Sequence, residues 1–153
     1  MQSCINLRTF VLMNRIYVDL DDTICDYTGA YNRSKVMKPE IEYPQSVYGF
    51  YLNLKMFDRV NFHLGMLEHA GYDVWLLSRP SFKNPLCYTE KRLWVENNLG
   101  EEWVEKFILA PDKSLLIGDY LIDDKPWDDF QGKQFLIGSD EYPDWYTILD
   151  ELT

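Results

Sequence analysis

The feature that most constrains this chain is a short apolar segment, residues 16–20, that ends in a group of acidic side chains. Its aromatic and β-branched residues favour a buried β-strand. Asp19, Asp21 and Asp22 place three carboxylates within four positions, where their charges repel one another unless a cation lies among them. Mg²⁺ takes oxygen ligands and leaves room for a substrate phosphate. The segment therefore predicts magnesium-dependent phosphate chemistry.

The pattern of apolar residues predicts alternating strands and helices along the rest of the chain. Such alternation is typical of an α/β fold, and we expect a Rossmann-like three-layer sandwich around a central, mainly parallel sheet. The expected strands are 16–20, 73–77, the end of 103–109, 115–117, 120–122 and 134–137, and the expected helices are 28–36, 56–70, 87–99, the start of 103–109 and 145–152.

The length of 153 residues predicts one domain. Met13 stands just before the first strand, so we interpret residues 1–14 as a dispensable N-terminal extension and residues 15–153 as the domain. Within it, residues 26–50 combine a short helix with a proline-containing loop. We expect this stretch to be a small, reduced cap inserted over the site.

Charge and cysteine content exclude several classes of partner. A formal net charge of −10 without a basic stripe argues against nucleic-acid polymers and anionic membranes, whereas a small phosphorylated substrate remains compatible. The N-terminal residues contain no long apolar run, so no signal peptide or membrane span is expected. Cys4, Cys25 and Cys87 are not spaced as metal ligands and suit a reducing compartment. We therefore expect a cytoplasmic protein.

The two histidines, His63 and His69, fall within the expected helix 56–70. We interpret them as packing or surface residues rather than as ligands.

Polar side chains directly follow three of the expected strands. Ligands of open parallel sheets bind beyond the carboxyl ends of the strands, so this coincidence predicts one shared site. The residues are Asp19 and Asp21 after the first strand, Ser78 and Arg79 after the second, and Asp123 and Asp124 after a later one.

The first acidic pair has the chemistry of a phosphate-transfer site. The Asp19 carboxylate can attack phosphorus and form an aspartyl-phosphate. Asp21, two residues on, can protonate the leaving oxygen and then activate the water that hydrolyses the intermediate. The alternative is a pair of loop or capping aspartates, which we would favour for an isolated Asp-x-Asp without a preceding buried strand.

Three further positions complete the candidate set. The Ser78 hydroxyl, with the next backbone N–H, can hold phosphate oxygens. Lys113 can offset the charge of the phosphate and of the nucleophile, although a solvated surface lysine is the alternative. One of Asp123 and Asp124 should bind the metal, and a helix N-cap is the alternative there.

Together, Asp19-x-Asp21-x-Thr23, Ser78, Lys113 and Asp123-Asp124 resemble the haloacid dehalogenase (HAD) superfamily of phosphohydrolases. Within that superfamily, two segments are similar to the 5'(3')-deoxyribonucleotidases, which carry a Tyr-x-x-Lys-x-x-Trp-Val helix and an Ile-Asp-Asp-x-Pro motif. The segments are residues 88–95, with Lys91 at the helix lysine, and residues 121–126. The resemblance covers most of residues 15–152.

The resemblance implies a role for each matched position. Asp19 would be nucleophile and metal ligand, and Asp21 would be acid/base with its main-chain carbonyl on Mg²⁺. Asp124 would be the direct metal ligand of its pair, with Asp123 supporting it, and Lys91 would be structural. The implied substrate-binding residues are Thr23, Tyr27 against the base, Ser78, Arg79 and Lys113.

The expected function is hydrolysis of deoxyribonucleoside monophosphates, and several alternatives stay open. Ser78 stands where threonine is frequent, and the 26–50 insertion is shorter than the cap of the animal enzymes, so another small phosphorylated metabolite is the first alternative. A phosphate-accepting receiver domain would need an aspartate where the second strand ends in Ser78. A silent binding protein and a dehalogenase are less favoured, because the full set of phosphatase residues is present. A homodimer also stays open.

Overall fold

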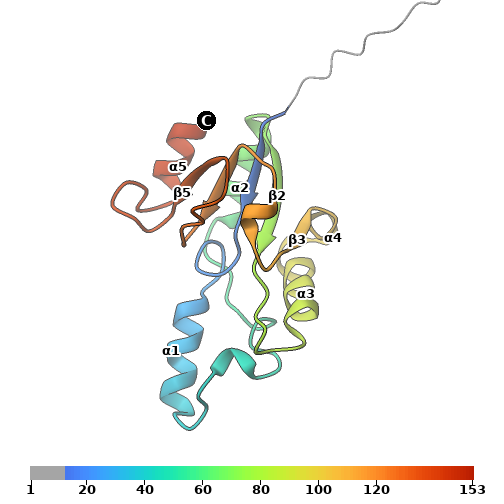
Figure 1. The fold of residues 1–153 in the computed structure, drawn as a ribbon, viewed down its shortest axis with the longest axis vertical. Coiled ribbons are helices and arrows are strands. Elements are labelled where there is room, and N and C mark those ends of the chain that lie inside the picture. The colour runs from blue at the N-terminus through green and yellow to red at the C-terminus, as the bar shows by residue number, and fades with distance from the viewer. Residues whose placement is uncertain (1–12) are drawn as a thin grey trace, which may run out of the picture.

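The computed structural model describes residues 13–153. Cys4 and nearly all of the proposed extension over residues 1–14 lie outside the described residues. The centre is a five-stranded sheet, all parallel, in the order β3-β2-β1-β4-β5 (Figure 1), which confirms the α/β prediction. The strands are β1 (Arg15–Val18), β2 (Asp73–Ser78), β3 (Phe107–Leu109), β4 (Tyr120–Asp123) and β5 (Lys133–Leu136).

The register of the sheet aligns the carboxyl ends of its three central strands. Val18 of β1 pairs with Leu76 of β2 on one side and with Ile122 of β4 on the other. The pairing continues past the strand, because Asp19 N donates to Ile122 O at 2.9 Å. The residues that follow these strands therefore meet at one edge of the sheet.

One face of the sheet is covered by helices. These are α2 (Val60–His69), α3 (Cys87–Leu99) and α5 (Trp145–Leu152), and α4 (Glu101–Val104) follows α3. Alternate strand residues such as Ile16 and Val18 pack with Leu64 of α2 and Trp94 of α3 in the main core. Burial of this apolar face is what holds the helices on the sheet. No helix within residues 13–153 is long and apolar enough to cross a bilayer.

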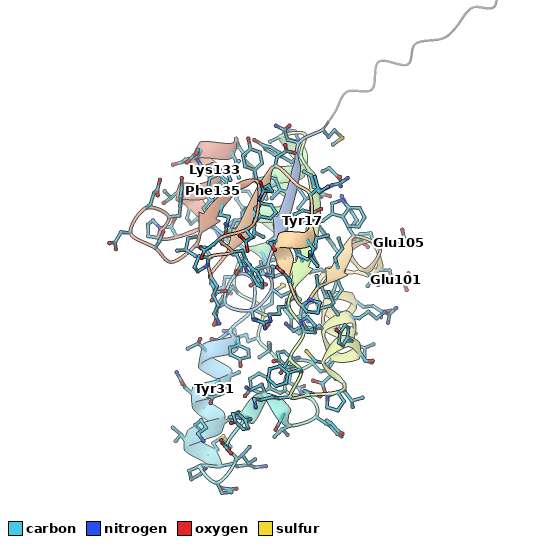
Figure 2. The ribbon with its side chains drawn as sticks, in the orientation of Figure 1. Tyr17, Tyr31, Glu101, Glu105, Lys133 and Phe135 are labelled. Carbon is cyan, nitrogen blue, oxygen red and sulfur yellow. The ribbon has the colours of Figure 1, made fainter. Side chains whose placement is uncertain are left out.

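Shorter segments cover the opposite face. Tyr17 (labelled in Figure 2), Leu77 and Leu121 point to that side and pack with Phe130. The covering layer includes the 3₁₀ turn η2 (Lys113–Leu115) and the connection between β4 and β5. The sandwich thus has three layers, with its helices concentrated on one side.

Two predicted elements were wrong in detail. The strand expected at 115–117 does not form, because Asp112 caps the η2 turn by accepting from Ser114 N, and Ile117 is left 88% exposed. The helix expected over 56–70 begins only at Val60, after Arg59 in the left-handed region (φ 62°). Phe57 N instead donates to Ile24 O at 2.9 Å, so the preceding residues pair with the loop after β1.

The segment between β1 and α2 projects from the sheet as a small cap. It contains α1 (Tyr27–Met37) and the 3₁₀ turn η1 (Pro44–Ser46), which lie together at the lower end of Figure 1. Asp26 caps α1 by accepting from Gly29 N at 2.9 Å. Helix α1 has no buried residue, so this cap stands mostly in solvent.

Candidate active site

The Asp19 carboxylate lies at the carboxyl end of β1, in the middle of the sheet edge. It is 4% exposed, and Lys113 Nζ donates to its Oδ1 at 2.5 Å. Thr23 Oγ1 donates to the other oxygen, Oδ2, at 3.3 Å. Asp19 is therefore held from two sides on the strand end.

Lys113 joins two strand ends. Lys113 is 1% exposed, and its ammonium group also donates to Asp123 Oδ2 at 2.6 Å, at the end of β4. The η2 turn places this lysine between the two carboxylates. Buried charges need paired, hydrogen-bonded partners, and each of these three groups has them here.

The acidic residues form a compact cluster. Asp19, Asp123 and Asp124 each offer one carboxylate oxygen, and these oxygens lie within 4.8 Å of one another. Burial raises the pKa of Asp19 to about 7, Lys113 opposes the rise, and Asp123 adds to it. Burial, followed by the charge of Asp123, likewise raises the pKa of Asp124 to about 7. The cluster therefore favours a cation or a proton at neutral pH.

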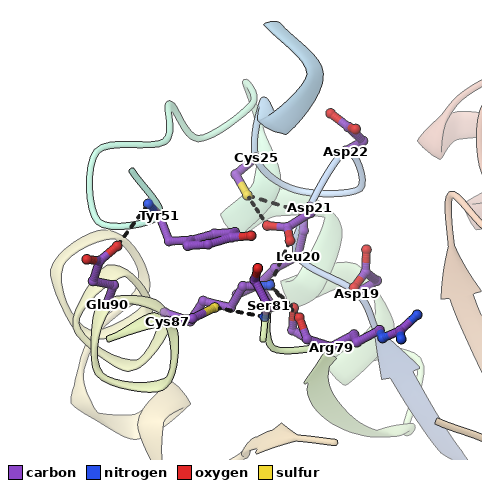
Figure 3. A network of polar contacts seen from close by, with 12 residues as sticks. Asp19, Leu20, Asp21, Asp22, Cys25, Tyr51, Arg79, Ser81, Cys87 and Glu90 are labelled. Atoms are coloured by element: carbon purple, nitrogen blue, oxygen red, sulfur yellow. Dashed lines mark hydrogen bonds and ion pairs between the residues drawn. The ribbon is translucent and has the colours of Figure 1, made fainter. Parts of the chain in front are cut away.

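Asp21 stands just outside this cluster and is bound to α3. Lys91 Nζ donates to Asp21 Oδ2 at 2.6 Å, and Cys25 Sγ donates to Oδ1 at 3.7 Å (Figure 3). Lys91 also donates to Ser78 Oγ at 2.7 Å and to Arg79 O at 2.8 Å. Burial lowers the pKa of Lys91, but the charge of Asp21 and its hydrogen bond outweigh burial, so the pKa lies above its ordinary value. Lys91 thus fixes both Asp21 and the end of β2.

Two residues of the predicted site, Ser78 and Thr23, are buried and contact other residues of the site. Ser78 is fully buried and accepts from Lys91, and Thr23 is 1% exposed and contacts Asp19. Arg79, by contrast, is exposed, and its guanidinium lies 6.0 Å from the centre of the Trp127 ring. Their assignment to phosphate binding stays a prediction.

A cavity of about 290 Å³ opens over the carboxylates. Charged side chains line the part of the cavity at the strand ends. The cap and the loop after β2 line the rest. The lining residues are Asp19, Asp21, Asp22, Tyr27, Gln45, Tyr51, Arg79, Pro80, Ser81, Phe82, Lys83, Lys113, Asp123, Asp124, Lys125 and Trp127.

An aromatic wall closes the cap side of the cavity. The rings of Tyr27 and Tyr51 stack with centres 6.1 Å apart and 27° between their planes. Phe50 packs on both rings from behind. Burial raises the pKa of Tyr27 to about 12, so this hydroxyl stays protonated. Such a wall suits a planar ligand.

Comparison with known proteins points to one enzyme family. No protein-family model matches the chain. A protein of Vibrio phage KVP40, provisionally named a 5'(3')-deoxyribonucleotidase, is 29% identical over 151 residues, which are 90% of this chain and 84% of the phage protein. The human cytosolic 5'(3')-deoxyribonucleotidase is 33% identical over 123 residues, 75% of this chain and 56% of the human protein. A Bordetella bronchiseptica protein with the same provisional name is 48% identical over 56 residues, 37% of this chain and 30% of that protein.

The phage protein matches nearly the whole chain at 29% identity. The chain is similar to proteins named 5'(3')-deoxyribonucleotidase. The parallel sheet with its acidic carboxyl edge fits a HAD-like phosphohydrolase, as the motifs predicted. The chain spans only about half the length of the human cytosolic relative.

The acidic cluster has the donor set that Mg²⁺ prefers. Its ligand atoms are carboxylate oxygens, which are hard donors, and a magnesium ion needs only a few of them beside water and substrate. Burial and, after it, the neighbouring carboxylates raise the pKa of Asp19 and of Asp124, and a bound cation would oppose that rise. Asp19, Asp123 and Asp124 are therefore the residues that could hold the metal.

The sequence did not reveal several residues of this candidate site. Trp127 donates from Nε1 to Asp123 Oδ2 at 3.1 Å, and its place three residues after the acidic pair was the only available signal. Gln45 and Lys83 line the cavity from loops without a motif. Gln45 Oε1 is buried and accepts no hydrogen bond from the described residues. These positions depend on how the cap lies against the loop after β2.

Proposed function

We propose that this chain is a magnesium-dependent phosphomonoesterase that hydrolyses 5'- or 3'-deoxyribonucleoside monophosphates to nucleoside and phosphate. The observation that carries the proposal is the cavity in which Asp19, Asp21 and Lys113 share one floor beneath an aromatic wall. The names of the relatives support the substrate class.

In the proposed reaction Asp19 is the nucleophile. One of its oxygens attacks phosphorus and the bond to the ester oxygen breaks, which leaves an aspartyl-phosphate and an alkoxide that takes a proton from Asp21. Asp21 then removes a proton from water, which attacks phosphorus and releases phosphate and the free Asp19 carboxylate. The Asp19–Lys113 contact of 2.5 Å keeps the nucleophile aligned and offsets its charge.

Mg²⁺ bound by Asp19, Asp123 and Asp124 would reduce the repulsion between the substrate phosphate and the nucleophile. Lys91 would hold Asp21 in place during both proton transfers. Its ammonium group contacts Oδ2 of Asp21, and the Cys25 thiol contacts Oδ1. Tyr27 and Tyr51 would receive the base on their ring faces.

The deciding experiment is phosphate release with Mg²⁺ from deoxyribonucleoside, ribonucleoside and sugar monophosphates, with Asp19→Asn as the matched control. We expect preference for deoxynucleotides and loss of turnover in Asp19→Asn without loss of folding, because the amide has the same shape but is a poor nucleophile. Retained activity in that variant would contradict the covalent mechanism. Activity on sugar phosphates alone would support phosphomonoester hydrolysis and contradict the deoxynucleotide as substrate.

A further inference from the structure

Glu90 of α3 is a buried carboxylate that the proposed mechanism does not use. It is 5% exposed, although burial of a charged group is costly without compensating contacts. Its Oε1 accepts from Gly49 N at 2.6 Å, and its Oε2 accepts from Tyr51 N at 3.1 Å and from Asn84 Nδ2 at 3.4 Å. The carboxylate therefore joins α3, the cap and the loop after β2.

The cap segment that Glu90 binds has irregular backbone. Gly49 has a φ of 89°, a left-handed conformation that favours glycine. Turn contacts order this stretch from within, such as Asn53 N to Gly49 O at 3.1 Å and Phe50 N to Val47 O at 3.1 Å. The amides of Gly49 and Tyr51 take the Glu90 oxygens as acceptors, and a charged acceptor makes the stronger kind of hydrogen bond.

These two amides determine where the Tyr51 ring lies. Figure 3 shows the ring extending from the Glu90 contact toward Asp21. Lys91 Nζ is 4.8 Å from the ring centre, and the ring stacks on Tyr27 with centres 6.1 Å apart. The ring therefore lines the cavity close to both Tyr27 and the Lys91–Asp21 contact.

Three residues on one side of α3 hold the site in the same way. Glu90 holds the backbone at Tyr51, Lys91 holds Asp21, and Trp94 Nε1 donates to Leu54 O at 2.7 Å. Helix α1 buries no residue, whereas Tyr51 and Leu54, which receive two of these contacts with α3, are buried in the main core. Packing of Tyr51 in the main core and the hydrogen bonds from α3 together fix the position of the wall.

We propose that Glu90 is a positioning residue for the substrate: its carboxylate fixes Tyr51 as the wall against the nucleobase, while the neighbouring Lys91 fixes the acid/base. This inference rests on the proposed function. It predicts that Glu90 affects recognition of the part of the substrate beyond the phosphate, and hardly affects the phosphate chemistry itself.

The test compares Glu90→Gln with the wild type on a deoxynucleotide and on acetyl phosphate, a substrate too small to reach Tyr51. Glutamine keeps the side-chain size but presents an N–H group to one of the two backbone amides, so one amide loses its acceptor. We expect KM for the deoxynucleotide to rise about ten-fold with kcat changed less than about three-fold. We expect kcat/KM for acetyl phosphate to stay within about two-fold. Glu96→Gln, which removes an exposed partner of Arg92 on the same helix, is the matched control and should change neither.

A double-mutant cycle with Tyr51→Leu separates positioning from a general loss of structure. If Glu90 acts through Tyr51, then Glu90→Gln should add little to the KM effect of Tyr51→Leu. Additive effects, or equal losses on both substrates together with a lowered Tm, would overturn the proposal. Glu90→Asp keeps the charge but is one methylene shorter. We expect it to raise KM for the deoxynucleotide by a smaller factor than Glu90→Gln does, and it replaces that variant if the glutamine variant folds poorly.

Hydrogen–deuterium exchange provides a reading that does not depend on catalysis. In Glu90→Gln the exchange of residues 47–54 should rise while that of α3 and the sheet stays unchanged. Unchanged exchange at 47–54, or a rise throughout the molecule, would contradict the role of Glu90. If the wild type fails to hydrolyse deoxynucleotides, the proposed function fails, and this exchange result still decides whether Glu90 positions the wall.

Discussion

At the scale of single residues, two buried lysines organise the site through different acceptors. Lys113 lies between Asp19 and Asp123 and serves the nucleophile and the acidic cluster. Lys91 lies between Asp21, Ser78 and the Arg79 carbonyl and serves the proposed acid/base. Each lysine donates to groups from separate strand ends, so each one both orients a reactive group and joins two strands.

Lys91→Met tests whether the orientation of Asp21 matters for turnover. Methionine fills similar space without a charge, so Asp21 loses its 2.6 Å contact and the proton transfers lose their alignment. We expect kcat to fall about 10²-fold, in the range of general acid–base catalysis. The measurement is steady-state phosphate release. Arg92→Met, at the neighbouring exposed position, is the control, and an equal loss there would show that the helix rather than the ammonium group is responsible.

At the scale of elements, the packing of α2 against α5 includes a buried histidine. His63 is 5% exposed and stacks on Trp145, with ring centres 5.1 Å apart and 15° between the planes. Both of its ring nitrogens lack a hydrogen-bond partner among the described residues. His69 is exposed, so the prediction that the histidines are packing or surface residues is confirmed.

This packing predicts a pH dependence of stability. Burial lowers the pKa of His63 from 6.5, the charge of Arg59 lowers it further, and Asp144 opposes both. The unfolded chain therefore binds the proton more readily than the folded one, so this contribution is complete above about pH 6.5 and is lost as the pH falls toward the folded pKa. We expect the Tm of the wild type to drop more between pH 7.5 and pH 5.5 than that of His63→Phe. Equal drops would show that His63 does not titrate with unfolding.

At the scale of the whole molecule, the three central strands and η2 meet at the acidic cluster. The oxygens of Asp19, Asp123 and Asp124 lie within 4.8 Å, and their repulsion opposes folding. Any cation that binds there stabilises the folded state by mass action.

Magnesium should therefore raise the thermal stability of the protein. At a Mg²⁺ concentration ten times its Kd, we expect a gain of about 1.4 kcal/mol, or roughly 3–6 °C in Tm. The measurement is thermal unfolding in MgCl₂ against NaCl of equal ionic strength, with Asp124→Asn as the variant that should lose the difference. Equal melting in both salts would contradict the metal assignment, and full activity in excess chelator would do so independently.

Much of the candidate site could be predicted from local sequence. Asp19, Asp123 and Asp124 follow apolar strands, and parallel strands bring their carboxyl ends together whatever the rest of the chain does. The segment 115–117 shows the limit of the same reasoning, because three apolar residues are too few to distinguish a strand from a capped turn. The start of α2 was missed for a similar reason, since Phe57 pairs with a loop 33 residues earlier.

The sequence by itself determined the α/β fold, the edge of the sheet that carries the site and the residue types that fit phosphate chemistry. These follow from hydrophobic periodicity and from the cost of clustered charges, which are local properties. Only the tertiary structure decided that Lys91 reaches Asp21 across 70 positions and that Glu90 holds Tyr51 against it. Those contacts depend on where the cap comes to lie on α3, which is set by packing of distant segments and by buried hydrogen bonds rather than by any pattern along the chain.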